Sequence, residues 1–125
     1  MSEKNKKQFG IWMDSQQATI VGREQDGTGN FMILAQEKNT GQGSNSSENA
    51  ANNAEKTLQQ KYFKEIAAHL QNVEELHVTG TGQAQEQFIS YLAATPQFKN
   101  AMANHSTSNK MANEKLVEFI TEKFN

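Results

Sequence analysis

A short run of large apolar side chains constrains the fold of this chain more than any other feature. Residues 30–35 (NFMILA) carry apolar side chains at both odd and even positions, so both faces of an extended strand would be apolar there. Such a strand is typical of a sheet that has helices packed against both sides. The run therefore predicts an α/β domain with a helical layer on each face of its sheet.

Two alternating segments precede this run. Residues 8–13 and 18–24 are predicted to be strands because apolar and polar side chains alternate along them. Residues 14–17 (DSQQ) and 25–29 (QDGTG) are rich in turn-forming residues and would close two hairpins. Together with residues 30–35, these segments predict a three-stranded β meander.

The pattern then changes to alternating helices and strands. Leu58, Tyr62, Ile66 and Leu70 recur at every fourth position, which predicts an amphipathic helix over residues 51–71. The remaining elements are predicted at residues 74–79 (strand), 83–94 (helix), 100–106 (strand) and 112–124 (helix).

The order of elements is βββ, loop, α, β, α, β, α. Right-handed crossovers would place the later strands parallel to the first strand of the meander and beside it. The predicted fold class is therefore α/β, a three-layer ribonuclease H-like domain with a mixed five-stranded sheet. We expect its centre to bury Ile33, Ile66, Leu70, Val78 and Ile120.

A long polar loop separates the meander from the first helix. Residues 36–52 (QEKNTGQGSNSSENAAN) contain no apolar side chain larger than alanine. Loops of more than about 12–15 residues are uncommon in compact domains and are usually either functional or disordered. The tip of this loop reads Gly41, Gln42, Gly43 and Ser44, and we predict a binding site there.

Composition excludes several functional classes. The net charge is −2, so the chain lacks the overall positive charge typical of nucleic-acid-binding proteins. We expect no DNA partner, and any RNA contact would have to use a local patch. It contains no cysteine, which excludes disulfides and thiolate chemistry and suits a reducing compartment. No signal peptide or membrane-spanning run is apparent, so we expect a cytoplasmic location. Residues 8–125 are predicted to form one domain, preceded by a flexible tail at residues 1–7.

Gly80, Thr81 and Gly82 join a predicted strand to a predicted helix. Backbone N–H groups at a helix N-terminus can bind an anion, so this turn is a second candidate site. The alternative is a tight turn that lets the helix pack on the sheet.

The three histidines do not have the spacing of metal ligands, and we expect neither a metal site nor a cofactor. His69 could pair with Glu65 on the surface of the helix, and His77 should face a helical layer as a hydrogen-bonded side chain. His105 falls in the weakest of the predicted strands. A structural role is predicted for each of the three.

The two aspartates, Asp14 and Asp26, both fall in predicted turns. A ribonuclease H-type nuclease needs several carboxylates that converge on two divalent ions, and the sequence offers no such set. Turn formation accounts for both residues. Trp12 could stack on a nucleic-acid base, but without basic neighbours it is predicted to be part of the core.

Several segments resemble, in order and spacing, the middle domain of archaeal and eukaryotic class-I peptide-chain release factors and of Pelota. They are FGIWMDSQQATIVGRE, NFMILA, the long loop, LQQKYFKEIAAHL, ELHVTGTGQAQEQFISYL and LVEFITEKF. Stand-alone bacterial proteins that contain this domain are more similar still. The resemblance covers residues 8–124 and implies the same ribonuclease H-like fold.

In the release factors, the loop at the same position carries Gly-Gly-Gln and promotes hydrolysis of peptidyl-tRNA. That chemistry needs glycines for an unusual backbone turn and a glutamine that positions water and stabilises the developing oxyanion. In this chain Gln42 follows one glycine and not two, and there is no Lys or Arg between Lys38 and Lys56. The missing second glycine argues against catalysis. The lack of Lys or Arg in the loop is a second departure, because without local cations there is little counterion release to hold the loop on RNA.

The resemblance implies a non-catalytic, translation-associated binding module that contacts the ribosome, a tRNA or a translation factor through residues 36–52. Two alternatives stay open. One is a peptidyl-tRNA or ester hydrolase that uses Gln42. The other is a small stress-related or oligomeric interaction protein without an RNA partner.

Overall fold

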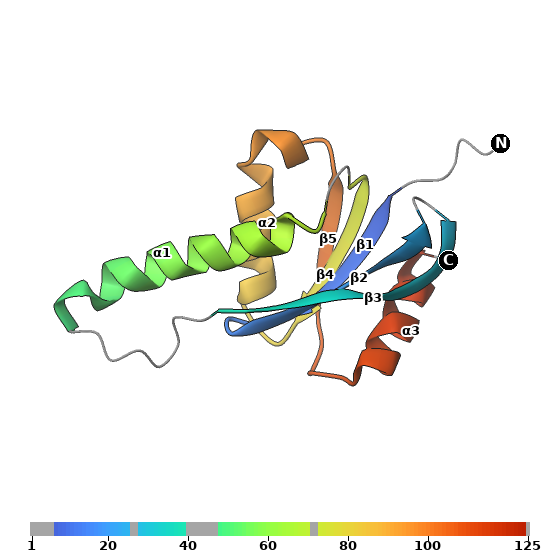
Figure 1. Ribbon diagram of the computed structural model, residues 1–125, viewed down its shortest axis with the longest axis horizontal. Coiled ribbons are helices and arrows are strands. Elements are labelled where there is room, and N and C mark those ends of the chain that lie inside the picture. The colour runs from blue at the N-terminus through green and yellow to red at the C-terminus, as the bar shows by residue number, and fades with distance from the viewer. Residues whose placement is uncertain (1–6, 26–27, 40–47, 71–72, 125) are drawn as a thin grey trace.

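The computed structural model describes residues 7–25, 28–39, 48–70 and 73–124, which form one α/β domain (Figure 1). Most of the predicted elements are present within a few residues of their expected positions. In chain order they are β1 (Gln8–Met13), β2 (Gln17–Gln25), β3 (Thr28–Lys38), α1 (Glu48–Ala67), β4 (Glu75–Gly80), α2 (Ala84–Ala93), the short 3-10 helix η2 (Pro96–Phe98), β5 (Met102–Thr107) and α3 (Asn113–Phe124).

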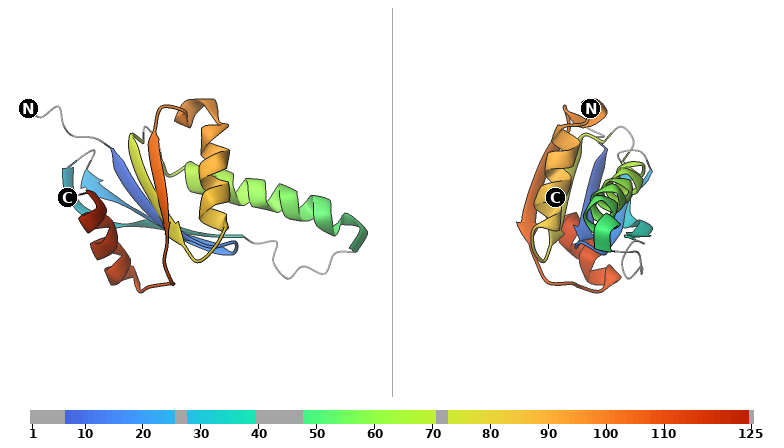
Figure 2. Two further views of the ribbon diagram at one scale, coloured as in Figure 1. Left: turned by 180° about the vertical axis from the view of Figure 1, so that it is seen from behind. Right: turned by 90° about the vertical axis from the view of Figure 1, so that its left-hand side faces the viewer.

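The five strands form one mixed sheet in the order β3-β2-β1-β4-β5. The meander β1–β2–β3 is antiparallel, whereas β4 and β5 lie parallel to β1. Helices α1 and α2 cover one face and α3 covers the other (Figure 2). The predicted three-layer ribonuclease H-like architecture is thereby confirmed.

Each face of the sheet carries its own apolar core. On the face of α1 and α2, the core includes Ile11, Ile20, Tyr62, Ile66 and Phe88. On the face of α3, it consists of the five residues Trp12, Val21, Phe31, Leu116 and Ile120. Four of the five residues predicted at the centre are completely buried: Ile66, Leu70, Val78 and Ile120.

The prediction for Ile33 and its strand is wrong. β3 lies at the edge of the sheet, and Ile33 is only partly buried. On the face of α1, Met32 and Leu34 remain 43% and 41% exposed. Helices do cover both faces of the sheet, as predicted. β3, however, lies at the edge of the sheet, where the helical layers end, so its apolar side chains are incompletely covered.

The long loop is shorter than predicted. β3 continues to Lys38, and Gln36 and Glu37 pair with Thr19 and Ala18 of β2. α1 begins at Glu48, so only residues 39–47 separate the two elements. Polar side chains do not prevent the backbone of an edge strand from pairing with its neighbouring strand. The predicted boundaries of the loop were wrong because they were based on side-chain polarity alone.

Two further boundaries differ. The second hairpin loop is shorter than residues 25–29, because Thr28 already belongs to β3. α1 ends at Ala67 and not at residue 71; a turn follows, in which the N–H of Leu70 donates to the carbonyl of Ala67 over 2.9 Å. The N-terminal part of α1 projects beyond the sheet (Figure 1). No helix in the described part of the chain is both long enough and apolar enough to span a bilayer.

Candidate functional site

Four predicted binding residues lie outside the described residues: Gly41, Gln42, Gly43 and Ser44. Both ends of their loop are described, because β3 ends at Lys38 and α1 begins at Glu48. The contacts that fix the root of the loop are formed by β3, by the β1–β2 turn and by α1.

The first residue of the loop is held by the β1–β2 turn. The backbone N–H of Asn39 donates to the carbonyl of Gln16 (2.8 Å), and its Nδ2 donates to the carbonyl of Ser15 (3.2 Å). Asp14 shapes that turn, because its Oδ1 accepts hydrogen bonds from the N–H groups of Gln16 (2.8 Å) and Gln17 (2.9 Å). The predicted turn-forming role of Asp14 is confirmed, and the turn also anchors the loop.

Helix α1 is attached to the same turn through Tyr62. The Tyr62 hydroxyl donates to the carbonyl of Asp14 over 2.9 Å, and only 1% of the residue is exposed. Burial raises the pKa of Tyr62 far above its ordinary value, and the charges of Asp14 and Glu37 raise it further. The phenol is therefore a neutral hydrogen-bond donor and ties α1 to the loop root.

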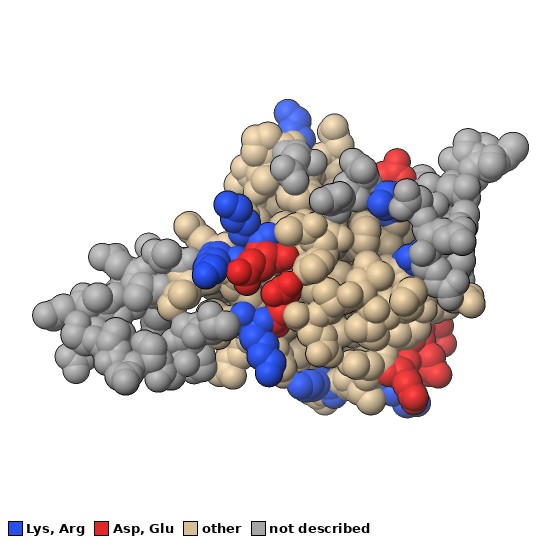
Figure 3. Space-filling model, in the orientation of Figure 1, with Lys and Arg blue, Asp and Glu red and all other residues tan. Residues whose placement is uncertain are grey.

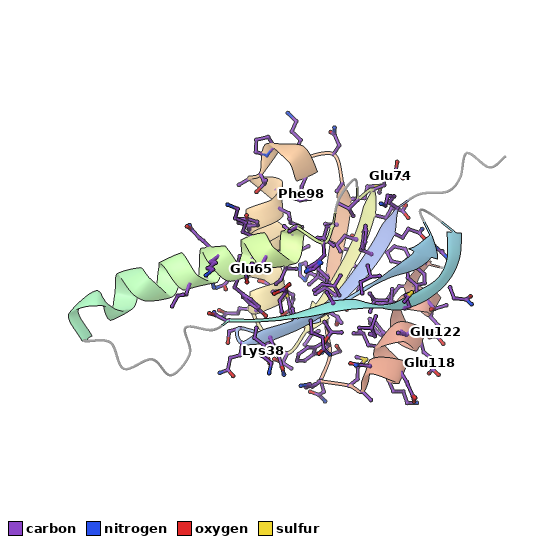
Figure 4. The ribbon with its side chains drawn as sticks, in the orientation of Figure 1. Lys38, Glu65, Glu74, Phe98, Glu118 and Glu122 are labelled. Atoms are coloured by element: carbon purple, nitrogen blue, oxygen red, sulfur yellow. The ribbon has the colours of Figure 1, made fainter. Side chains whose placement is uncertain are left out.

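His69 forms a second connection between α1 and β3. Its Nε2 lies 2.6 Å from Oε2 of Glu37, and both side chains are partly exposed. The predicted pairing with Glu65 is wrong, because His69 lies in the turn after α1, where the four-residue spacing of the helix no longer applies. Charged side chains gather where α1 meets the end of β3 (Figure 3), and Lys38 and Glu65 lie in this region (Figure 4).

A small hollow lies beside the loop root, between the ends of β2 and β3 and the segment that leads into α3. Its volume is about 80 Å³, and its lining includes Gln17, Gln36, Lys38 and Lys110. Lys38 and Lys110 are exposed and come from segments far apart in the sequence. Lys38 and Lys110 thus border the same hollow, together with the amide residues Gln17 and Gln36 and the acidic residue Glu37.

Trp12 also borders this hollow, but its indole ring belongs to the core. Only 3% of the residue is exposed, and it packs with Leu116 and Ile120. Its Nε1 donates to the carbonyl of Asn109 (3.2 Å), and Lys110 Nζ lies 6.0 Å from the ring centroid. The predicted core role is confirmed, since a ring enclosed in this way cannot serve as a stacking platform.

At the second candidate site, Gly80–Thr81–Gly82, the backbone at the end of β4 lies very close to the backbone at the end of β1. A Cβ on Gly80 would lie 2.0 Å from the carbonyl oxygen of Met13. The buried side chain of Gln85 fixes the turn, because its Nε2 donates to the carbonyls of Gly80 (3.2 Å) and Ser106 (3.1 Å). Close packing therefore explains the first glycine, and the anion-binding role of the turn stays a prediction.

His77 forms hydrogen bonds, as predicted. Its Nε2 lies 2.9 Å from Oγ of Ser106, and its ring contacts Phe119 of α3 with the ring centroids 5.8 Å apart. Burial lowers the pKa of His77, and the charges of Lys123 and His105 lower it further. Among the residues that the structure describes, no three His, Cys, Asp or Glu side chains could together hold a metal ion.

Sequence reasoning did not identify Lys110 or the contact between Glu37 and His69. Lys110 lies at the end of a polar segment, residues 104–110 (NHSTSNK), and carries no local signal. Glu37 and His69 are 32 positions apart. They meet only because α1 packs beside β3 in the folded chain. No periodic pattern in the sequence predicts such a contact.

No protein-family model matches this chain, and no curated protein sequence matches it. Solved structures do match. The Pelota protein of Thermoplasma acidophilum has a TM-score of 0.65 and 18% sequence identity over 97% of this chain. Archaeoglobus fulgidus Pelota has a TM-score of 0.59 and 17% identity over 97% of the chain.

The archaeal translation termination factor aRF1 is similar to the same degree, with a TM-score of 0.59 and 17% identity over 95% of this chain. This chain spans about a third of each of these proteins: 32% and 34% of the two Pelota chains and 35% of aRF1. It resembles their middle domain. At these identities the likeness establishes the fold.

Proposed function

We propose that this chain, which has the fold of the middle domain of Pelota and of release factors, is a non-catalytic binding module of the translation machinery. In this proposal it works in the cytoplasm and contacts the ribosome, a tRNA or a translation factor through residues 36–52. The observation that carries the proposal is the pair of lysines, Lys38 and Lys110, beside the root of the loop.

The way in which the root of the loop is held supports the proposal that residues 36–52 are presented to a binding partner. Asn39 is bonded to the β1–β2 turn, and Tyr62 ties α1 to the same turn. His69 adds a contact between α1 and β3. The start of the loop at Asn39 is thus held by a rigid scaffold, which lowers the entropic cost of docking compared with a free segment, and binding loops are commonly held in this way.

The charge distribution favours an RNA contact at the root. The chain as a whole carries a net charge of −2, so a contact with RNA phosphates must be local. Lys38 and Lys110 provide two cations at one hollow, and Gln17 and Gln36 add amide donors. Glu37 also borders the hollow, but its Oε2 is engaged by Nε2 of His69 at 2.6 Å. This arrangement suits one or two backbone phosphates of ribosomal RNA or tRNA.

Co-sedimentation with purified ribosomes tests the proposal. Two phosphate contacts on single-stranded RNA give a slope of roughly −1.4 in log K against log salt, so binding should weaken about sevenfold between 50 and 200 mM salt. The double variant Lys38→Gln/Lys110→Gln should lose most of the binding. Lys99→Gln is the matched control, because it removes one exposed lysine next to Phe98, on the opposite side of the molecule from Lys38 (Figure 4).

Three results would contradict the proposal. If the wild-type protein does not co-sediment with ribosomes at 50 mM salt, the link to translation is lost. If it releases peptide from stalled ribosomes and Gln42→Ala abolishes that release, the hydrolase alternative is correct. Equal binding by wild type and the double-lysine variant would place the contact away from the loop root.

A further inference from the structure

The outer edge of β3 is exposed and carries apolar side chains. β3 is the first strand of the sheet, and no strand in the described part of the chain pairs with its outer edge. Between Thr28 and Gln36 it carries no charged residue. Among the residues whose side chains the structure describes, three large apolar ones are exposed, and two of these, Met32 and Leu34, belong to β3.

Met32 and Leu34 lie on the same face of the sheet. Met32 pairs with Gly22 of β2, and a Cβ on Gly22 would lie 2.6 Å from Cδ1 of Leu34. Leu34 therefore covers the bare backbone of Gly22 beside Met32. In the space-filling view, uncharged surface extends over β3 and β2, beside the charged cluster at the end of α1 (Figure 3).

The two edges of the sheet differ in this respect. The opposite edge, β5, exposes Met102 but otherwise the polar side chains of Asn104, His105 and Thr107. Natural sheets usually protect an edge with charges, prolines or bulges, because unpaired backbone groups attract another strand. The centre of β3 has neither a charge nor a proline, and the bulge at Leu34 is the protection that it does have.

We propose that β3 is an interface at which two copies of this chain pair edge to edge, antiparallel, about a twofold axis near Ile33. The strand is self-complementary in this register. Met32 of one copy lies opposite Leu34 of the other, and the twofold axis brings all four of these side chains into one cluster. Glu37 and Lys38 lie opposite Gly29 and Thr28 of the second copy, so no like charges meet.

The neighbouring antiparallel registers fit less well. Centring the axis on Leu34 would place Phe31 opposite Glu37, and centring it on Met32 would place Leu34 opposite Asn30. Each of these registers pairs an apolar side chain with a polar one. A second copy of the chain therefore matches this edge best when the axis passes near Ile33, and the twofold symmetry makes the interface isologous and closed.

The dimer should be weak. Leu34 is an extra residue in the β2–β3 pairing, because Ile20 is opposite Ala35 while Val21 is opposite Ile33. Such a bulge twists the strand locally and limits how far a second strand can follow it. An interface of one short strand pair also lies below the usual size of stable interfaces, so we expect a dissociation constant between about 1 µM and 1 mM.

Sedimentation equilibrium tests the proposal. The weight-average mass of the wild type should rise from 14.0 kDa toward twice that value as the concentration approaches about 1 mM. Leu34→Lys should weaken association at least about tenfold, because each lysine would lie opposite the apolar Met32 of the other copy, and the two lysines would be diagonal neighbours across the axis. Met102→Lys is the matched control on β5 and should associate like the wild type. Circular dichroism melts establish that each variant is folded, and Met32→Lys provides a second variant at the same patch.

A cross-linking experiment tests the register. The chain has no cysteine, so introduced cysteines are the only thiols present. An oxidised mixture of Met32→Cys and Leu34→Cys should give a disulfide-linked heterodimer, because these positions oppose each other at a separation that a disulfide can span. Each variant alone should give much less.

Three results would overturn the proposal: a wild type that stays at 14.0 kDa at about 1 mM, a folded Leu34→Lys variant that associates as strongly as the wild type, or loss of association only in Met102→Lys. The last result would place the interface on β5.

Discussion

Replacing Gly80 by alanine should destabilise the domain strongly, whereas the same replacement at Gly82 should leave it almost unchanged. A Cβ on Gly80 would lie 2.0 Å from the carbonyl oxygen of Met13 and 2.9 Å from Oε1 of Gln85. The carbonyl belongs to the backbone of β1, the central strand, so it cannot rotate away as a flexible side chain would. A Cβ on Gly82 meets no atom within 4 Å.

The size of the effect follows from this geometry. Overpacking an interior costs about 1–3 kcal/mol, and we expect the upper end for Gly80→Ala because β1 and β4 must move apart. At about 4 °C per kcal/mol for a chain of 125 residues, about 3 kcal/mol lowers Tm by about 12 °C. Gly82→Ala should change the free energy of unfolding by less than about 0.5 kcal/mol. Thermal melts followed by circular dichroism and urea unfolding measure both.

A Gly80→Ala variant that melts within about 2 °C of the wild type would refute the reasoning, because β1 and β4 could not then approach as closely as the structure shows. Equal losses in the two variants would also contradict it. In that case a property of the whole turn, and not one backbone contact, would account for the glycines.

Three other outcomes are expected. Ile66→Ala should cost about 2–5 kcal/mol in urea unfolding, because it leaves a cavity where α1 meets the sheet; a loss below about 0.5 kcal/mol would contradict the assignment of that helix face. The pKa of His77 is lowered in the folded protein, so the unfolded chain binds the proton more readily and stability should fall as the pH drops below the ordinary histidine value of 6.5. His77→Gln should reduce that slope, and an unchanged slope would assign it to other groups. Gly41→Val/Gly43→Val should abolish ribosome co-sedimentation with nearly unchanged Tm, and undiminished binding would show that the loop backbone is not the contact.

The sequence by itself determined the order and type of nearly all elements. Hydrophobic periodicity is a local property, and it identified α1 from the spacing of Tyr62 and Ile66 and β1 from simple alternation. Turn chemistry is local as well, and it explained Asp14 correctly. Topological rules for crossovers then led from this order to the sheet, because only a few arrangements satisfy them.

Only the tertiary structure decided which strand lies at the edge and which distant side chains meet. NFMILA reads as a central strand, yet among the described strands β3 pairs only with β2, and Met32 and Leu34 stay exposed. Lys38 and Lys110 share a hollow because the end of β3 and the start of α3 lie side by side in space. Strand position and long-range proximity depend on how the whole chain packs, and no window of neighbouring residues contains that information.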